Sequence, residues 1–266
     1  MTQQSWSGGR RALLTLGGLA LLSACAGPPP PKPGGPAAKP ATVPSSPAPS
    51  VPPPSPTPTA LPPIAIQTKP LYVVPAAAVP KGSKAVALTF DDGPDPAYTP
   101  QVLKILRQQH IKATFFVIGQ QAHDHPALIK SIIDEGHTIG THTWSHKDVS
   151  RMPAARARTE IGRAIDTVAA TTGHIPHLFR APYGSWSPTA FKVCAELGQT
   201  SIAWDVDPRD WDNAGWDQIR SKVLHQVGNR SIVLTHDGGG DRSQTVRALR
   251  KFLPVLIDRG YRFVGV

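Results

Sequence analysis

The chain has 266 residues and a formal net charge of +10, enough length for one domain of ordinary size and additional segments. Its first 70 residues hold five basic residues and no acidic one, so the rest of the chain has only a mild basic bias. No run of basic residues with interleaved aromatics occurs, which argues against a nucleic-acid partner. Two cysteines, Cys25 and Cys194, do not encode a disulfide framework. Cys194 lies in an apolar stretch and is predicted to be a small buried side chain.

Residues 1–26 have the features of an export signal. An apolar run at 12–24 follows a pair of arginines; it is short for a membrane span, and its flanking charge suits a signal peptide. The arginine pair also resembles a twin-arginine signal. The run ends in Leu-Ser-Ala-Cys at Cys25, which resembles the lipobox of bacterial lipoproteins and implies lipidation of Cys25. Ordinary cleavage after Ala26 is the alternative. We therefore expect a lipoprotein on the extracytoplasmic face of the membrane, or a secreted protein.

Residues 27–80 are predicted to be a disordered linker. Between positions 28 and 70 the chain holds 18 of its 30 prolines, with Ala, Ser, Thr and Gly in most of the gaps. Such a composition cannot bury enough apolar surface to fold. A proline-rich spacer extends by ~3.1 Å per residue, so this stretch could reach roughly 130 Å.

The pattern of the chain changes after residue 80, where short strand-like runs alternate with amphipathic segments. Strands are predicted at 85–90, 113–118, 138–141, 178–180, 201–206, 232–235 and 262–266. Helices are predicted at 100–109, 126–135, 153–171, 188–197, 216–227 and 244–258. This alternation is typical of a parallel α/β architecture. We expect residues 82–266 to form a small or incomplete (β/α) barrel of about seven parallel strands, with an open doubly wound sheet as the alternative.

Polar residues cluster where the apolar strands end. The clusters are Asp91-Asp92-Gly93, His142 to His146, Arg180 to Gly184, Asp207 to Trp211, and His236-Asp237-Gly238. In (β/α) barrels the carboxyl ends of the strands share one face, which holds the active site. The five clusters are therefore expected to meet in one site.

The residue types in these clusters are those of an open metal site. Asp91 and Asp92 repel each other unless a cation lies nearby or one of them acts as a base, although such a pair could also form a simple turn. His142 and His146 are four residues apart, which on a helical turn puts both imidazoles on one side. With one aspartate they supply a two-histidine, one-carboxylate set, which zinc hydrolases and non-haem iron oxygenases both use. The second carboxylate, Arg180 and a third histidine favour hydrolysis.

Five stretches together resemble, in order, the motifs of the polysaccharide deacetylase family, carbohydrate esterase family four. They are Thr89–Pro94, His142–His146, Arg180–Gly184, Asp207–Trp211 and Leu234–Asp237. The resemblance covers about residues 82–266. The third motif departs from the usual pattern at Ala181, where the family often has Pro, a change that touches no reactive group.

The resemblance implies roles for the first motifs. Asp92, His142 and His146 would bind a divalent metal, most commonly Zn²⁺. Asp91 would be the general base that takes a proton from water. Arg180 would pair with Asp91 and keep it ionised.

The resemblance also implies roles for the remaining motifs. The backbone N–H of Tyr183 would stabilise the oxyanion of the tetrahedral intermediate. His236 would protonate the leaving amine, and Asp210 would orient its imidazole. Trp211 and Leu234 would line a small pocket for the acetyl methyl group.

The activity implied is removal of N-acetyl groups from a cell-wall or chitin-like glycan, such as peptidoglycan or a polymer of N-acetylglucosamine. The chain is expected to be a monomer that contacts its acetylated polysaccharide substrate and, through the lipid anchor, the membrane. One alternative is an O-acetyl esterase acting on acetylated xylan, because both reactions pass through the same tetrahedral intermediate. Another is a glycan-binding wall anchor without catalysis.

Overall fold

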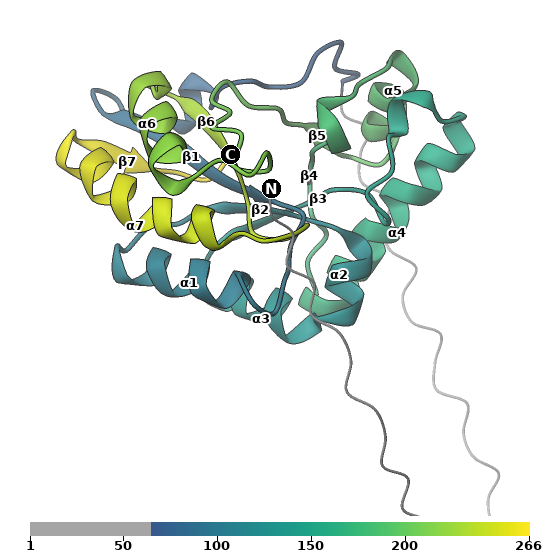
Figure 1. Cartoon of the computed structure of the whole chain (residues 1–266). Coiled ribbons are helices and arrows are strands. Elements are labelled where there is room, and N and C mark those ends of the chain that lie inside the picture. Colours follow the sequence, from purple (N-terminus) through teal and green to yellow (C-terminus); the bar gives the residue numbers. More distant parts are fainter. Residues whose placement is uncertain (1–64) are drawn as a thin grey trace, which may run out of the picture. The chain divides into compact units, whose positions relative to one another are not determined.

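The computed structural model describes residues 65–266 (Figure 1). The predicted signal peptide, the lipidation site at Cys25 and most of the predicted linker lie outside the described residues and stay predictions. None of the helices in the described part is long and apolar enough to cross a membrane.

Strands and helices alternate along the chain, as the sequence predicts. The strands are β1 (Lys84–Asp91), β2 (Thr114–Val117), β3 (Thr138–Thr141), β4 (Leu178–Phe179), β5 (Thr200–Ser201), β6 (Ser231–His236) and β7 (Tyr261–Phe263). The helices are α1 (Thr99–Gln108), α2 (Gly119–Asp124), α3 (Pro126–Asp134), α4 (Ala154–Thr172), α5 (Pro188–Glu196), α6 (Trp216–Gln226) and α7 (Ser243–Asp258). Short 3₁₀ turns cover Ala76–Ala78, Val149–Arg151 and Pro182–Gly184. Proline occupies the first turn of α1, α3 and α5, where its missing N–H leaves no helical bond unmade.

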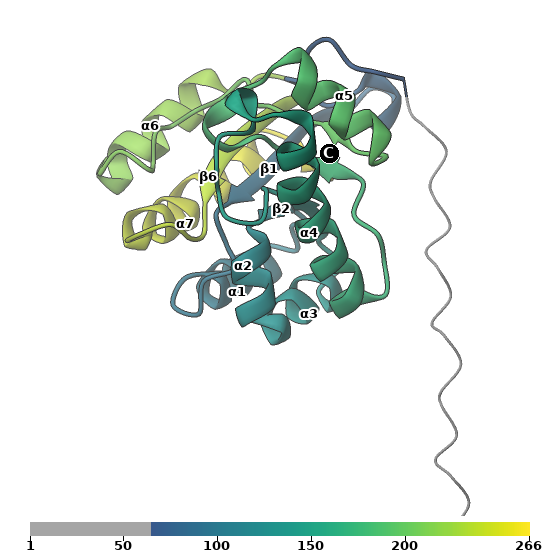
Figure 2. The same ribbon diagram turned by 90° about the vertical axis from the view of Figure 1, so that its right-hand side faces the viewer.

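The strands form one curled parallel sheet in the order β5-β4-β3-β2-β1-β6. β7 pairs with the first residues of β1. Beyond β5 the chain reaches β6 at the parallel bridge between Val206 and Val233, so the two edges of the sheet approach each other. The helices lie around the outside of the sheet, with α6 and α7 on one side and α4 and α5 on the other (Figures 1 and 2). The prediction of a small or incomplete (β/α) barrel is confirmed.

Successive side chains of a strand point to opposite faces of the sheet, and they therefore contribute to two separate apolar layers. In β1, Val86, Leu88 and Phe90 point outward into the main core, which includes residues of α1, α3, α6 and α7. Ala87 points the other way, toward Phe116 and residues of β6 in the barrel interior. Asp91 is four residues beyond Ala87 and therefore also faces the interior, at the carboxyl end of the strand.

The fifth strand is shorter than predicted. The pattern of 201–206 predicts a single strand, but only Thr200 and Ser201 pair with β4 as a strand. Ala203 instead donates its N–H to the carbonyl of Leu71, and Val206 pairs with β6. Residues 202–206 thus have the alternating side-chain pattern of a strand, but their backbone pairs first with Leu71 and then with β6, in the gap between the two edges of the sheet.

Residues 65–79 pack against the barrel, although the sequence places them in the linker. We call this segment the strap. Leu71 pairs with Ile202 beyond β5, and Val73 pairs with Ser231 at the start of β6, so the strap bridges the two edges of the sheet. Val74 is fully buried in the interior apolar layer. Contacts with the barrel therefore extend back at least to Gln67, well before residue 82, where the sequence places the start of the domain. The amino-acid composition of this segment did not predict its packing, because the strap needs only a few apolar residues to bind to the barrel.

Candidate active site

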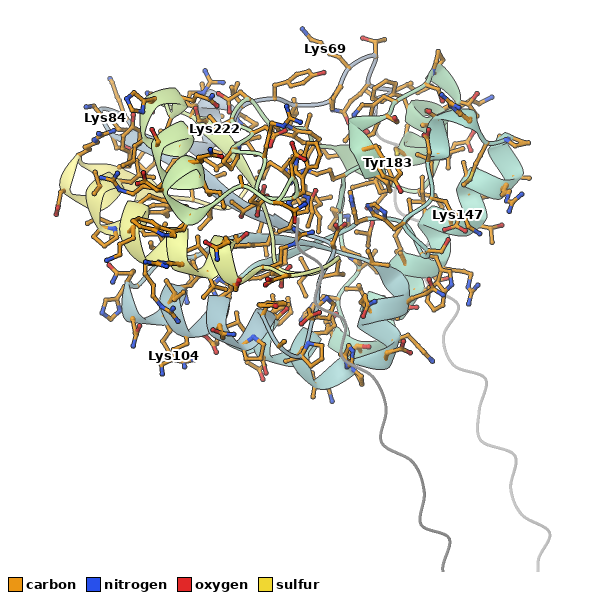
Figure 3. The ribbon with its side chains drawn as sticks, in the orientation of Figure 1. Lys69, Lys84, Lys104, Lys147, Tyr183 and Lys222 are labelled. Carbon is orange, nitrogen blue, oxygen red and sulfur yellow. The ribbon has the colours of Figure 1, made fainter. Side chains whose placement is uncertain are left out.

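A pocket of about 340 Å³ opens at the carboxyl ends of the strands. Its lining includes members of all five polar clusters, together with Trp204 and Leu234: Asp91, Asp92, His142, His146, Ala181, Tyr183, Trp204, Asp207, Trp211, Leu234 and His236. Tyr183 lies on the side of the molecule that carries α4 and α5 (Figure 3). The strand ends thus bring together residues that are up to 145 positions apart, from Asp91 to His236.

Asp91 is held by a buried ion pair. Its Oδ1 accepts a hydrogen bond of 2.7 Å from Nη1 of Arg180, which also donates to the Thr89 hydroxyl at 2.8 Å. Nη2 of Arg180 donates to the Ala203 carbonyl at 2.9 Å, and its guanidinium lies 4.1 Å from the ring centroid of Phe116. Arg180 is fully buried, and an arginine stays charged in proteins. This packing fixes the Asp91 carboxylate in one orientation, with its other oxygen free to act.

Asp92, His142 and His146 converge at the rim of the pocket. Oδ1 of Asp92 lies 3.1 Å from Nε2 of His146 and 3.6 Å from Nε2 of His142. One ligand atom from each of the three residues lies within 4.8 Å of the other two. Within residues 65–266, these three side chains form the cluster that could hold a metal ion. Oδ1 of Asp92 is buried and accepts no well-formed hydrogen bond. A divalent cation fits at this point, because it would satisfy the orphaned oxygen and both imidazoles.

The protonation states suit metal ligation. Burial lowers the pKa of His142, although Asp91 and Asp92 oppose the effect, so its imidazole is neutral. Nδ1 of His142 lies 2.8 Å from the Arg180 carbonyl oxygen and must donate to it, which leaves the Nε2 lone pair for a metal. Burial would raise the pKa of Asp92, but the imidazoles of His146 and His142 hold it well below its usual range. His142 therefore offers a neutral nitrogen and Asp92 a carboxylate oxygen, and with the imidazole of His146 they form a donor combination that zinc accepts.

The two histidines do not lie on a helical turn, which corrects the sequence-based explanation for their convergence. Residues 142–146 form a loop after β3, with positive φ angles of 63° at Thr143 and 56° at His146. Asp92 also has a positive φ of 71°. Left-handed backbone is uncommon for these residue types and is concentrated at functional sites. The loop turns both imidazoles toward Asp92 without helical periodicity.

His236, which lines the same pocket as the metal-ligand group, forms a second buried pair with Asp210. Nδ1 of His236 lies 2.7 Å from Oδ1 of Asp210, and the backbone N–H of His236 donates to Oδ2 at 2.9 Å. The hydroxyl of Thr245 donates to the same Oδ2 at 2.8 Å. Burial would lower the pKa of His236, but the Asp210 carboxylate raises it to about 9. The imidazole is therefore protonated at neutral pH, with Nε2–H available as a proton donor.

The remaining wall of the pocket is largely apolar. Leu234 is buried, whereas Tyr183 and Trp211 are 69% and 46% exposed at the pocket mouth. Tyr183 adopts a left-handed φ of 62° within a 3₁₀ turn, and its ring packs edge-on against His146 at 4.8 Å. These positions are compatible with the roles that the resemblance implies for all three residues.

Sequence reasoning missed two side chains that line the pocket. Trp204 stands two residues beyond the inward-facing Ile202, so period-two alternation could have placed it inside. Asp207 belongs to the fourth motif but was given no role; its Oδ1 accepts the N–H of Arg209. Burial raises the pKa of Cys194 to about 12, in agreement with an unreactive buried thiol.

The fold and the site together define a (β/α)-barrel hydrolase with a two-histidine, one-carboxylate group at the carboxyl ends of its strands. Residues 78–202 match the family model for polysaccharide deacetylase. A peptidoglycan-N-acetylglucosamine deacetylase of Bacillus cereus is 45% identical over 71% of this chain and 89% of its own length. A chitooligosaccharide deacetylase of Sinorhizobium fredii is 42% identical over 68% of this chain and 89% of its own length.

The structural comparison agrees. A crystal structure of a peptidoglycan N-acetylglucosamine deacetylase superposes with a TM-score of 0.68 at 37% identity, covering 70% of this chain and 88% of that one. The chain belongs to the polysaccharide deacetylase family.

Proposed function

We propose that this protein is a metal-dependent deacetylase that removes N-acetyl groups from a glycan of N-acetylglucosamine, with peptidoglycan or a chitin-like chain as substrate. The observation that carries the proposal is that the buried carboxylate of Asp91 and the protonated imidazole of His236 line the same pocket as the metal-ligand group. Amide hydrolysis needs both a base for water and an acid for the amine. The relatives named as peptidoglycan and chitooligosaccharide deacetylases support the substrate class.

Asp92, His142 and His146 would hold the metal, and zinc is the cation we propose from the donor set. When bound, a divalent cation supplies a Lewis acid that polarises the acetyl carbonyl and makes water more acidic. The protein's contribution is to present three aligned ligand atoms. The bond from His142 to the Arg180 carbonyl fixes one imidazole tautomer.

Asp91 would take the proton from the attacking water. Its Oδ1 is committed to Arg180, so Oδ2 is the free basic atom, and it lies 3.9 Å from Nε2 of His142 and thus beside the ligand group. The Arg180 guanidinium holds the carboxylate in place through the ion pair. The backbone N–H of Tyr183 would stabilise the negative oxygen that develops on the acetyl carbon.

His236 would donate the proton that the leaving nitrogen needs. Because Asp210 keeps the imidazole protonated and holds Nδ1, the proton on Nε2 is the one available to the pocket. Leu234 and Trp211 would enclose the acetyl methyl group, since both line the same pocket. An acetyl group fits such a small apolar wall, whereas a sugar ring would remain at the exposed mouth.

An O-acetyl esterase acting on xylan is the second candidate, because an ester oxygen leaves without full protonation and the same residues would suffice. The decisive experiment measures acetate release by the full-length exported protein from peptidoglycan, chitooligosaccharides and acetylated xylan, with and without chelator. We expect release from the first two, its loss with chelator and its recovery with Zn²⁺. Release from xylan alone would favour the esterase. Glycan binding with no release and no bound metal would favour a non-catalytic wall anchor.

We also propose that the protein is a lipoprotein anchored through Cys25 at the extracytoplasmic face of the membrane. Support comes from the signal-like sequence that ends at Cys25 and from the cell-wall substrate of the named Bacillus relative. Cys25→Ser is expected to move the protein from the membrane fraction to the soluble fraction, as measured by fractionation and immunoblot. Wild-type protein found free in the medium would contradict the anchor.

A further inference from the structure

Arg242, the residue immediately before α7, is a buried arginine whose hydrogen bonds go to backbone. It is 6% exposed. Nε donates to the carbonyl of Gly238 at 2.7 Å, Nη2 donates to that of Gly239 at 3.0 Å, and Nη1 donates to that of Asp210 at 3.3 Å. Because the guanidinium donates three hydrogen bonds to backbone carbonyl oxygens, it holds in place the loops that contain those carbonyls.

The three carbonyls lie on the two loops that form the acid side of the site. Gly238 and Gly239 belong to the loop between β6 and α7, directly after His236. Asp210 belongs to the loop between β5 and α6. The carboxylate of Asp210 receives the imidazole, while its backbone carbonyl receives Arg242. Arg242 therefore ties together the loop of the proton donor and the loop of the residue that orients it.

Gly238 and Gly239 also pack closely against the metal-ligand residue Asp92. A Cβ atom added to Gly238 would collide with the carbonyl oxygen of Asp92, and one added to Gly239 would lie 2.6 Å from Asp92 Oδ2. Asp92 itself has a left-handed backbone, so its side-chain position depends on neighbours that fit closely. The location of the glycine loop thus limits where the Asp92 carboxylate can lie.

We infer that Arg242 is a positioning residue that sets the metal ligand Asp92 and the acid His236 at the same time, through the loop that touches both. This inference rests on the proposed function. The positioning role requires a planar guanidinium that donates in three directions, and a positive charge alone would not be sufficient. Lysine offers one compact ammonium on a flexible stem and cannot reach three divergent carbonyls from fixed positions.

The test compares Arg242→Lys and Arg242→Gln with the matched control Arg250→Lys, an exposed position on the same helix. Residues that orient metal ligands typically change affinity or activity by about 10- to 100-fold when replaced. We expect kcat on chitotetraose to fall by about that factor in Arg242→Lys, with KM within about twofold of wild type. Zinc affinity, measured by competition with a chromophoric chelator, should weaken by about tenfold or more. Arg250→Lys should match wild type in both measurements.

Thermal unfolding distinguishes positioning from simple support of the fold. Loss of kcat and of zinc affinity at temperatures well below the unfolding midpoint would support the inference. A lower midpoint with unchanged kcat and zinc affinity would overturn it, and so would failure of both Arg242 variants to fold, since Arg242 would then serve the domain as a whole. If wild-type protein binds zinc but releases no acetate, the proposed function fails, while the zinc measurements still decide whether Arg242 positions Asp92.

Discussion

The two sides of the pocket differ in how many of their buried carboxylate oxygens have a hydrogen-bond partner within the protein. On the acid side, the Asp210 carboxylate accepts from the His236 ring, the His236 N–H and the Thr245 hydroxyl, so each of its oxygens has a partner. On the ligand side, Asp92 Oδ1 is buried without a good donor, next to a second carboxylate at Asp91. Arg180 compensates the charge of Asp91 but makes no hydrogen bond to Asp92.

This difference indicates which half of the site the chain completes by itself. Buried polar atoms in native proteins nearly always have partners, and a divalent cation would supply one for the Asp92 oxygen that lies between two imidazoles. The acid side has its hydrogen bonds in place within the chain, whereas the ligand side would complete its interactions with the metal that we propose. Four substitutions test this difference between the two sides.

The largest effect is expected from Asp92→Ala. Removing the only carboxylate of the ligand group leaves two imidazoles, which hold zinc too weakly for it to survive dialysis. Bound zinc, measured by atomic absorption, should fall from about one per chain to near zero, and acetate release should fall to that of the blank. Full zinc occupancy in this variant would contradict the assignment of Asp92 as a ligand.

Asp91→Asn should separate chemistry from metal binding. The amide can still accept a hydrogen bond from Arg180 but cannot take a proton from water, so kcat should fall by about 10²–10⁴-fold. Zinc content should remain near that of wild type, because Asp91 is not among the ligands. Full activity in Asp91→Asn would rule out Asp91 as the base.

His236→Ala should have a substrate-dependent effect. An amine leaves poorly without protonation, so release from an N-acetylated oligosaccharide should fall by about 10²-fold or more. An activated ester such as p-nitrophenyl acetate has a good leaving group and should lose much less. Zinc content serves as the control and should not change. Equal losses on the two substrates would argue against the role of His236 as an acid.

Asp210→Asn is expected to have the smallest effect, which appears as a change in pH dependence. The pKa of His236 is raised to about 9 by Asp210, so the acid form persists to that pH in the wild type. Without the Asp210 carboxylate, burial lowers the pKa of His236, and only the charges of Asp91 and Asp92 still oppose that effect. The alkaline limb of the kcat profile should therefore move from near pH 9 to lower pH. An unchanged profile would show that another group sets that limb.

Sequence patterns predicted the barrel well because its strands and helices have clear periods. The strand at 138–141 and the helix starts at Pro126, Pro188 and Trp216 were placed correctly, and an N-terminal proline marks the first two of these helices. The short helix α2 and the two-residue strands β4 and β5 were less predictable. Their extent depends on contacts with residues far along the chain, such as Leu71 against Ile202.

The motifs predicted that residues from the carboxyl ends of the strands meet in one pocket, although they did not point to Trp204, and the roles assigned to those residues stay predictions. The geometry of the site was less predictable. The left-handed backbone at Thr143 and His146 could not be read from the sequence, because a β-branched residue such as Thr rarely adopts positive φ and most His residues do not adopt it either. Arg242 was also missed, because its partners are backbone carbonyls, which leave no signature in side-chain types.

The strap has a practical consequence for anyone who shortens the chain. The family match begins at residue 78, which suggests a natural place to cut. A protein that starts there would lack Leu71 and Val74, which cover apolar residues of the barrel seam such as Ile202 and Ile232. Uncovered apolar surface promotes self-association. A soluble catalytic fragment should therefore keep residues from 65 onward, even though the preceding sequence looks like a mere spacer.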